Sequence, residues 1–405
     1  MLTKLKSKWN RFWHTPLTGE KLFFFAYTIS LFCSFIINTT FMQYIPVRYL
    51  NWINYLMILV LILKVIIFDH SKPIQLLFFG LLLMLAAYSW RKTTLTLLMV
   101  MMAYILAAKG ISFHKIVERY FDVNFVMIVG ISLYSMLGIV RNLGFERDGF
   151  IRHSMGVDYP TDFAAYILYL VVAYLFLNYS KLNYRHYIGL IFLAVCLNLI
   201  TNARLDVYML LITLIVFLIT KRAESPQNLM ARTVVSSFWS LSVILPYGYF
   251  LLTEFFDSKT EIFVELNKIL SGRLLYGHLA LDKYGITIFG QHIVEHGWGG
   301  VAGLERFRNA QFKYFFIDST FIRLFVIYGA ILGIFIISVL VIISVRETLK
   351  HNYVFPAVIL IITISSLIDQ HLLEITFNPF LLALLANTSE NKSEDRFNNE
   401  KAVHS

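Results

Sequence analysis

The chain has 405 residues, of which 58% are hydrophobic and only 15% are charged, and its mean hydropathy is +0.67. Soluble domains are about 45–50% apolar and about 25% charged, so this composition excludes an ordinary soluble protein. The net charge of +10 does not indicate nucleic-acid binding, because Lys and Arg are spread over the connections between apolar segments. The sequence therefore predicts an integral membrane protein.

Apolar segments close to the length needed to cross a bilayer, about 17–25 residues, recur along the chain. Such segments occupy residues 22–42, 52–68, 74–89, 93–108, 123–140, 161–177, 187–200, 207–220, 235–252, 320–345, 353–368 and 372–386. An unpaired backbone amide is costly in lipid, and the alternating ten-residue rhythm of a barrel is missing. We expect an all-α transmembrane bundle of about twelve spans.

The spacing of these segments divides the chain into four parts. Residues 1–252 hold the first nine spans, 253–319 form one long loop, 320–386 hold the last three spans, and 387–405 form a polar tail that we expect to be disordered. With the N-terminus inside, most Lys and Arg residues fall on the inner side, as the positive-inside rule requires. Both termini are therefore expected in the cytoplasm, and the long loop outside.

Ionisable residues gather at the expected outer ends of the helices. They are Arg141, Arg147, Arg152, His153, Asp158, Asp162, Arg204, Asp206, Asp318, Arg323, Asp369, His371 and Glu374. Any one of them is equally consistent with an ordinary interfacial charge in contact with water. Their concentration on one side favours a shared polar surface at the outer leaflet.

The long loop contains two segments with helical apolar spacing, "EIFVELNKIL" and "RLLYGHLALDKY". Ser271 and Gly272 separate them, which places Arg273 in the first turn of the second helix. A helix N-terminus with an adjacent guanidinium is suited to binding a diphosphate. An amphipathic helix lying on the membrane surface accounts for the same residues.

Three loop histidines, His278, His292 and His296, have the side chain needed for a general base near neutral pH. A solvated loop histidine explains each of them as well. The glycines of "HGWGGVAG" indicate a flexible turn. No zinc-ligand spacing, Walker sequence or Asp-x-Asp pair occurs, so the sequence disfavours an ATP-driven pump and a soluble nucleotide-sugar transferase.

The loop segment "SGRLLYGHLALDKYGITIFGQ", followed by "FFIDSTFIRLFVIYGAILG", resembles the long outer loop and following helix of Wzy-type polysaccharide polymerases. These proteins belong with the O-antigen ligases to one polytopic family. The upstream stretches "RHSMGVDYPTDFAAYILYL" and "TNARLDVYMLLITLI" are also similar to that family. The chain departs from the Arg-x10-Gly pattern of some polymerases, because Tyr284 stands eleven residues after Arg273.

The resemblance implies an enzyme of the bacterial cytoplasmic membrane. It would transfer a glycan from undecaprenyl diphosphate to a sugar hydroxyl of another lipid-linked repeat unit at the outer leaflet. Such an enzyme uses no metal or nucleotide cofactor, and its partner proteins would be the flippase and the chain-length regulator of the same pathway. Capsule, exopolysaccharide or O-antigen would be its product.

By position, Arg152, Arg204 and Arg273 match the family's outer arginines, which would hold the diphosphate. Arg323 joins them as a further substrate-binding candidate because of its depth in the tenth span. The resemblance makes His278 the first candidate for the catalytic base, with Asp318 the second.

Three alternatives stay open on the sequence alone. A ligase of the same family would leave long lipid-linked chains when it is lost, whereas a lost polymerase leaves single units. A lipid-linked oligosaccharide flippase would place its binding residues near the bilayer midplane, where few polar residues occur. A scaffold subunit would tolerate substitution of the outer arginines.

Overall fold

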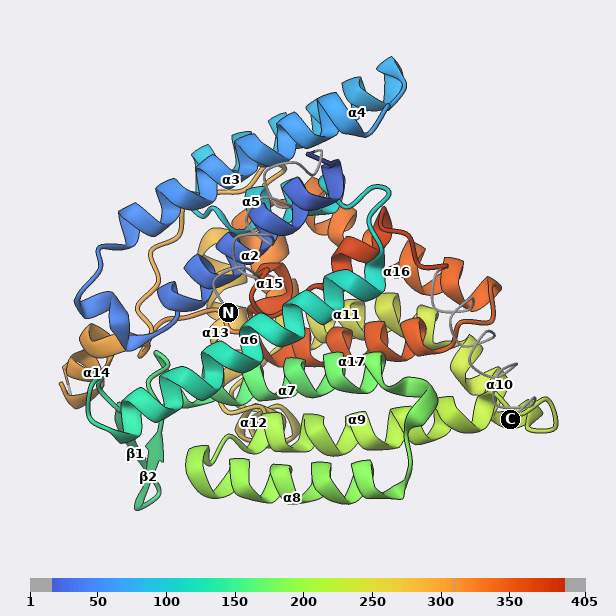
Figure 1. The fold of residues 1–405 in the computed structure, drawn as a ribbon. Coiled ribbons are helices and arrows are strands. Elements are labelled where there is room, and N and C mark those ends of the chain that lie inside the picture. The colour runs from blue at the N-terminus through green and yellow to red at the C-terminus, as the bar shows by residue number, and fades with distance from the viewer. Residues whose placement is uncertain (1–16, 310, 390–405) are drawn as a thin grey trace, which may run out of the picture.

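The computed structural model describes residues 17–309 and 311–389, which are predominantly helical; residues 390–405 of the expected disordered tail lie outside this description. The helices of the bundle run side by side (Figure 1). Their bounds are α2 (Gly19–Ile37), α3 (Val47–Phe68), α4 (Pro73–Thr93), α5 (Leu97–Ala107), α6 (Phe113–Met136), α7 (Pro160–Leu177), α8 (Tyr184–Thr201), α9 (Arg204–Ala223), α10 (Leu229–Ser236), α11 (Phe238–Glu254), α16 (Ala330–Leu349) and α17 (Val354–Ile368).

Six helices of the described chain, α2, α3, α4, α7, α8 and α16, are long and apolar enough to cross a membrane. A seventh crossing arises if α10 and α11, which meet at an angle of 46°, form one span. Helices α5 and α17 are apolar but shorter. Large apolar side chains such as Leu77, Phe192 and Ile334 are exposed on the outside of the bundle, as in a lipid-facing surface. These features indicate a membrane protein.

Helix α17 lies at the centre of the bundle. It packs against α9, α11 and α16, and most of its residues are buried. A helix that is apolar on all sides is stable only when other helices or lipid surround it. This central position places the end of α17, at Ile368, beneath the polar cavity described below.

The prediction of a twelfth membrane-spanning helix at residues 372–386 is wrong. This segment contains only two short 3₁₀ helices, η4 (His371–Leu373) and η5 (Phe380–Leu384). Most of its side chains are buried in the protein. Irregular backbone is tolerated at membrane depth only where protein surrounds it, because lipid offers no hydrogen-bond partners.

The buried segment runs back along α17. Arg346, near the end of α16, donates to the carbonyl oxygens of Leu384 and Ala383 over 2.7 and 2.6 Å. Asn387 exchanges backbone hydrogen bonds with Ile111 and Phe113 beside the start of α6. The segment therefore ends close to where α16 ends and α17 begins.

The tenth expected span, residues 320–345, is broken rather than continuous. It consists of α15 (Thr320–Arg323), a π-helical turn (Leu324–Tyr328) and α16, which follows Gly329 at φ 93°. The segment after α13 (Arg273–Tyr284) fills the break. The Gln291 amide donates to the Ile327 carbonyl over 2.8 Å, and the Ala330 amide donates to the Thr287 carbonyl over 2.9 Å.

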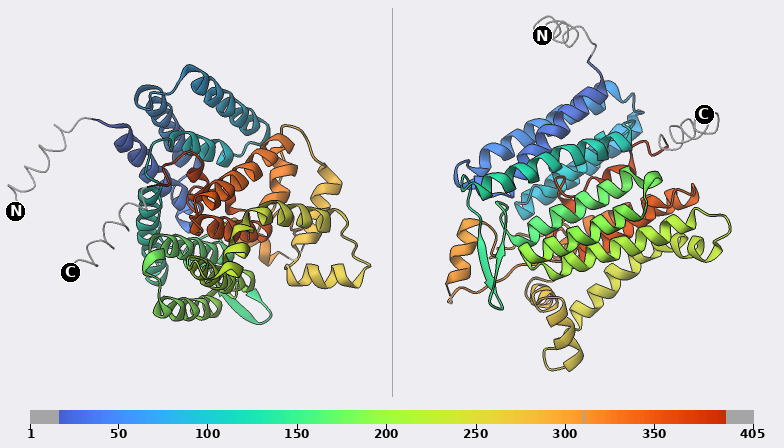
Figure 2. Two further views of the ribbon diagram at one scale, coloured as in Figure 1. Left: turned by 90° about the vertical axis from the view of Figure 1, so that its right-hand side faces the viewer. Right: turned by 60° about the horizontal axis from the view of Figure 1, so that its bottom comes forward.

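A β-hairpin and the short helix α14 lie at one end of the bundle, which we call the hairpin end (Figures 1 and 2). Strands β1 (Gly144–Arg147) and β2 (Phe150–His153) form an antiparallel hairpin. The glycine-rich stretch expected to be a flexible turn instead leads into helix α14 (Gly300–Arg308). The expected helices α12 (Glu261–Ile269) and α13 are present.

Candidate functional site

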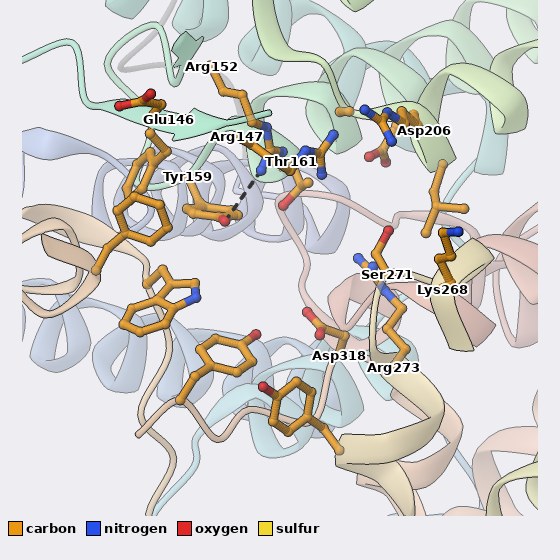
Figure 3. Close-up of a pocket in the computed structure, with 18 residues that line it drawn as sticks. Glu146, Arg147, Arg152, Tyr159, Thr161, Asp206, Lys268, Ser271, Arg273 and Asp318 are labelled. Atoms are coloured by element: carbon orange, nitrogen blue, oxygen red, sulfur yellow. Dashed lines mark hydrogen bonds between the residues drawn. The ribbon is translucent and has the colours of Figure 1, made fainter. Parts of the chain in front are cut away.

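A cavity of about 470 Å³ lies at the hairpin end. Its walls come from the hairpin, the start of α9, the corner between α12 and α13, helix α14 and the segments before α7, α14 and α15. Figure 3 shows Arg147, Arg152 and Arg273 reaching toward this space, with Asp318 beside Arg273. Chain segments far apart in sequence therefore meet at one polar site.

The hairpin presents two arginines on one face. Phe145 pairs with Arg152, and Arg147 pairs with Phe150, so these four side chains share a face. The turn residues Asp148 and Gly149 have φ values of 54° and 75°, as expected of an Asp-Gly turn between two strands. The local sequence thus folds so that Arg147 and Arg152 face the cavity.

Both hairpin arginines are held by the turn between α8 and α9. Arg152 Nε donates to the Thr201 carbonyl over 2.8 Å, and Arg147 donates to the Asn202 carbonyl. The guanidinium carbon of Arg152 also lies 5.4 Å from the ring centroid of Tyr159. These contacts fix the direction of each guanidinium before any ligand arrives.

Helix α9 and the α12–α13 corner complete the basic wall. Arg204 is exposed and pairs with Asp148 over 3.0 Å, while Asp206 is buried two residues further along. Arg273 Nε donates to the Ile368 carbonyl at the end of α17 over 2.5 Å. Lys268 and Ser271 also line the cavity.

The amides at the start of α13 do not form the expected anion site. Gly272, Arg273 and Tyr276 donate their backbone N–H groups to Asn267, Leu270 and Gly272. The Leu275 amide donates to the Asn267 side chain over 3.1 Å. Because these donors are already used, any anion here would be bound by side chains rather than by the helix terminus.

Two arginine donors in the cavity lack a partner within the described chain. Within the described part of the chain, Arg152 Nη2 and Arg147 Nε are buried without a hydrogen-bond acceptor. The pKa of Arg147 is lowered by burial and then by the cations of Arg152 and Arg204. A buried unpaired donor is costly, and like charges repel, so this wall is suited to a multiply charged anion.

Asp318 lies where two cavities meet. It lines the main cavity and an adjoining one of about 100 Å³. Burial raises the pKa of Asp318 above its ordinary value, and the guanidinium groups of Arg273 and Arg323 oppose this rise. A carboxylate with increased proton affinity beside a cationic wall is suited to general-base chemistry.

Behind the smaller cavity, His371 is enclosed by three carboxylates. Its Nδ1 lies 2.9 Å from Glu374, and its Nε2 lies 3.3 Å from Asp369 and 3.5 Å from Asp162. The ring stacks on Phe377 with a centroid distance of 3.7 Å. This buried cluster joins the start of α7 to the end of α17, and Asp162 extends it to the cavity wall.

Two predicted site residues lie elsewhere. His278 Nδ1 is 3.0 Å from the Thr253 carbonyl oxygen, and the residue lines neither cavity. Arg323 is buried in an ion pair with Glu295 at 2.7 Å and also donates to the Ile317 carbonyl. Arg323 thus holds the segment that carries Asp318 without reaching the cavity. Arg152, Arg204, Arg273 and Asp318 do converge.

The sequence places Arg147 and Asp206 in the outer polar group without a specific role and gives no indication of Lys268, although all three line the cavity. The Asp-Gly pair between "GFER" and "FIRH" is a hairpin signal that would have placed Arg147 beside Arg152. Lys268 carries no comparable signal, because its position depends on the angle between α12 and α13.

Comparison with protein-family models, with curated proteins and with solved structures finds no match to this chain. A functional interpretation therefore depends on the chemistry of the cavity itself.

Proposed function

We propose that the protein is a polysaccharide polymerase that transfers a glycan from a polyprenyl diphosphate carrier to a sugar hydroxyl of another lipid-linked repeat unit. The observation that carries this proposal is the convergence of four arginines and Lys268 on one cavity, with buried guanidinium donors that have no acceptor in the described chain. A diphosphate on a membrane lipid supplies the charge that this wall requires. The apolar exterior supports a lipid-linked substrate.

The reaction exchanges one bond at the anomeric carbon of the donor sugar. The acceptor hydroxyl oxygen forms a bond to this carbon while the bond from the carbon to the diphosphate oxygen breaks. The electron pair leaves with the lipid diphosphate, and the hydroxyl proton passes to the Asp318 carboxylate. Negative charge grows on the leaving group, so cations already fixed near it lower the barrier.

The arginines fall into three roles in this scheme. Arg152 and Arg273 are held by the backbone carbonyls of Thr201 and Ile368, which fixes them for the transition state. Arg204 is exposed at the rim and pairs with Asp148, which is also exposed. Its side chain is therefore able to turn toward an incoming diphosphate. Arg323 is a positioning residue, because it acts through the segment that carries Asp318.

We place this chemistry at the outer leaflet of a bacterial cytoplasmic membrane, with both termini inside. The basic residues at the opposite end of the bundle, such as Lys109, Lys221 and Arg346, support this orientation. The predicted count of about twelve crossings stays a proposal, in which the buried irregular segment 371–387 makes the last one.

The test is a reconstitution with a defined undecaprenyl-diphosphate-linked repeat unit, scored for a ladder of oligomers. Arg273→Ala removes a fixed cation, so it should lower the polymerisation rate by about 100-fold, within the usual range for loss of one charge-stabilising group. In cells, single lipid-linked repeats should accumulate.

Arg48→Ala is the matched control, because Arg48 is exposed at the start of α3 and lines neither cavity. This variant should give a normal ladder. A normal ladder from Arg273→Ala would contradict the proposed role of Arg273. If long lipid-linked chains accumulated undiminished in cells carrying this variant, the ligase hypothesis would be favoured instead.

A further inference from the structure

A continuous arc of aromatic rings also lines the cavity. In order of contact, the rings are Tyr159, Phe145, Phe307, Trp298, Tyr314 and Tyr276, and all six residues line the main cavity. Neighbouring ring centroids in this order are 4.7, 5.4, 5.5, 4.9 and 4.8 Å apart. The rings come from β1, α13, α14 and the segments before α7, α14 and α15, so the arc does not follow from one amphipathic helix.

One pair of rings in the arc is stacked face to face. Trp298 and Tyr314 are stacked with an interplanar angle of 27°, whereas their neighbours in the arc meet them edge-on. Both residues are only partly buried, and both also line the smaller cavity beside Asp318. A purely structural aromatic cluster would have its rings covered by protein, as Phe145 is.

We propose that the stacked pair of Trp298 and Tyr314 forms a sugar-binding platform, in which the face of Trp298 turned away from Tyr314 holds the pyranose ring joined to the diphosphate. The proposal rests on the proposed function, because it assigns the arginines to the diphosphate. A pyranose ring has a face of polarised C–H bonds, which the electron-rich face of an aromatic ring attracts. A lipid diphosphate without a sugar has no group that needs such a surface.

The dimensions fit one sugar next to the charged group. Ligand sites of about 300–1,000 Å³ hold drug-sized molecules, and the main cavity measures about 470 Å³. Asp318 lines both the cavity with the basic wall and the smaller one beside the platform. A sugar on the platform would therefore present its anomeric carbon near both the diphosphate site and the base.

The experiment compares the affinity of the purified full-length protein for two probes, undecaprenyl diphosphate and the same lipid carrying one hexose. Wild-type protein should bind the hexose-bearing lipid more tightly. Trp298→Ala should weaken binding of that lipid about three- to tenfold, the range expected for loss of one stacking contact, and leave the sugar-free lipid unaffected. Trp298→Phe should keep most of the preference.

Trp239→Ala is the matched control, because Trp239 stands in the first turn of α11, away from both cavities. It should bind both lipids normally. An equal loss of both lipids in Trp298→Ala, or no loss of either, would overturn the platform while leaving the polymerase proposal intact. Failure of the wild type to bind either lipid would instead overturn the polymerase proposal, and the platform with it.

Discussion

At the scale of single residues, the position of Asp318 decides the choice of catalytic base. His278 was the first candidate by resemblance, yet its imidazole faces the Thr253 carbonyl and the ring of Phe256. Asp318 lies in the cavity, and burial raises its pKa. A histidine is recognised from sequence by its ordinary pKa, whereas an aspartate acquires the required proton affinity only from its surroundings.

Asp318→Asn should lower the polymerisation rate by about 100- to 10,000-fold, the usual contribution of a general base. Binding of the lipid-linked substrate should persist, because the arginine wall is intact. A base acts only when deprotonated, so the wild-type rate should fall as the pH drops through the pKa of Asp318, which lies above the ordinary value of 3.8. The measurement is the rate as a function of pH.

His278→Ala serves as the comparison for Asp318→Asn and should retain most of the wild-type rate, because it reaches neither cavity. If His278→Ala were the inactive variant and Asp318→Asn the active one, the base would have to be reassigned to the loop histidine.

The arginines illustrate both the reach and the limit of sequence reasoning. Arg152, Arg204 and Arg273 were selected by position and do meet at the cavity. Their convergence depends on the α8–α9 turn and on the end of α17, which supply the accepting carbonyls. Those tertiary contacts leave no mark in the local sequence. The position of Lys268 depends in the same way on the angle between α12 and α13, so the sequence does not identify it as a site residue.

At the scale of elements, apolar length predicted helices well where lipid or protein surrounds them, as in α3, α4 and α7. The same criterion failed for residues 372–386, because a buried irregular segment can be as apolar as a membrane-spanning helix. Asn378 and Pro379 interrupt this stretch, and the Asn378 side chain is hydrogen-bonded to the Leu372 carbonyl. Hydropathy alone does not distinguish these two outcomes.

The break between α15 and α16 depends on two glycines that face each other. A Cβ added at Gly329 would lie 2.3 Å from the Gly290 nitrogen, and one at Gly290 would lie 2.4 Å from the Ile327 carbonyl oxygen. Both residues also have positive φ values, 93° and 89°. The two segments that meet at these glycines lie next to α15 and the residues before it, which carry Arg323 and Asp318.

Gly329→Ala should therefore lower the thermal unfolding midpoint measured in detergent, at a cost exceeding the ~1–3 kcal/mol of backbone strain alone, because φ 93° with ψ 163° is adopted almost only by glycine. Polymerisation should fall with it, because Asp318 would shift. Gly80→Ala is the control, since Gly80 lies inside α4 with no atom within 4 Å of the added Cβ; helix propensity should leave it neutral or slightly stabilised. Equal midpoints for Gly329→Ala and the wild type would show that the close contact between Gly329 and Gly290 does not contribute to stability.

At the scale of the whole molecule, composition indicates a membrane protein built of helices. It does not indicate how the segments at the hairpin end assemble around the polar cavity. The cavity joins residues from the ranges 145–152, 159–161, 203–206, 268–276, 298–307 and 314–318. Each piece follows or precedes a helix end, so a bundle brings all of them to the same side. Which pieces touch is set by the packing of α9 and α11 on α17, and this packing is not encoded in any one segment.

The proposed orientation of the whole bundle is testable by cysteine labelling in a variant in which Cys33 and Cys196 are replaced by alanine. Asp148 stands at the exposed tip of the hairpin, and Lys181 is exposed in the turn between α7 and α8 at the opposite end of the molecule. A membrane-impermeant maleimide added to intact cells should label Asp148→Cys at once, and should label Lys181→Cys only after the membrane is permeabilised. Because the basic cavity lies on the side of Asp148, labelling of Lys181→Cys alone in intact cells would place the arginines in the cytoplasm and exclude chemistry at the outer leaflet.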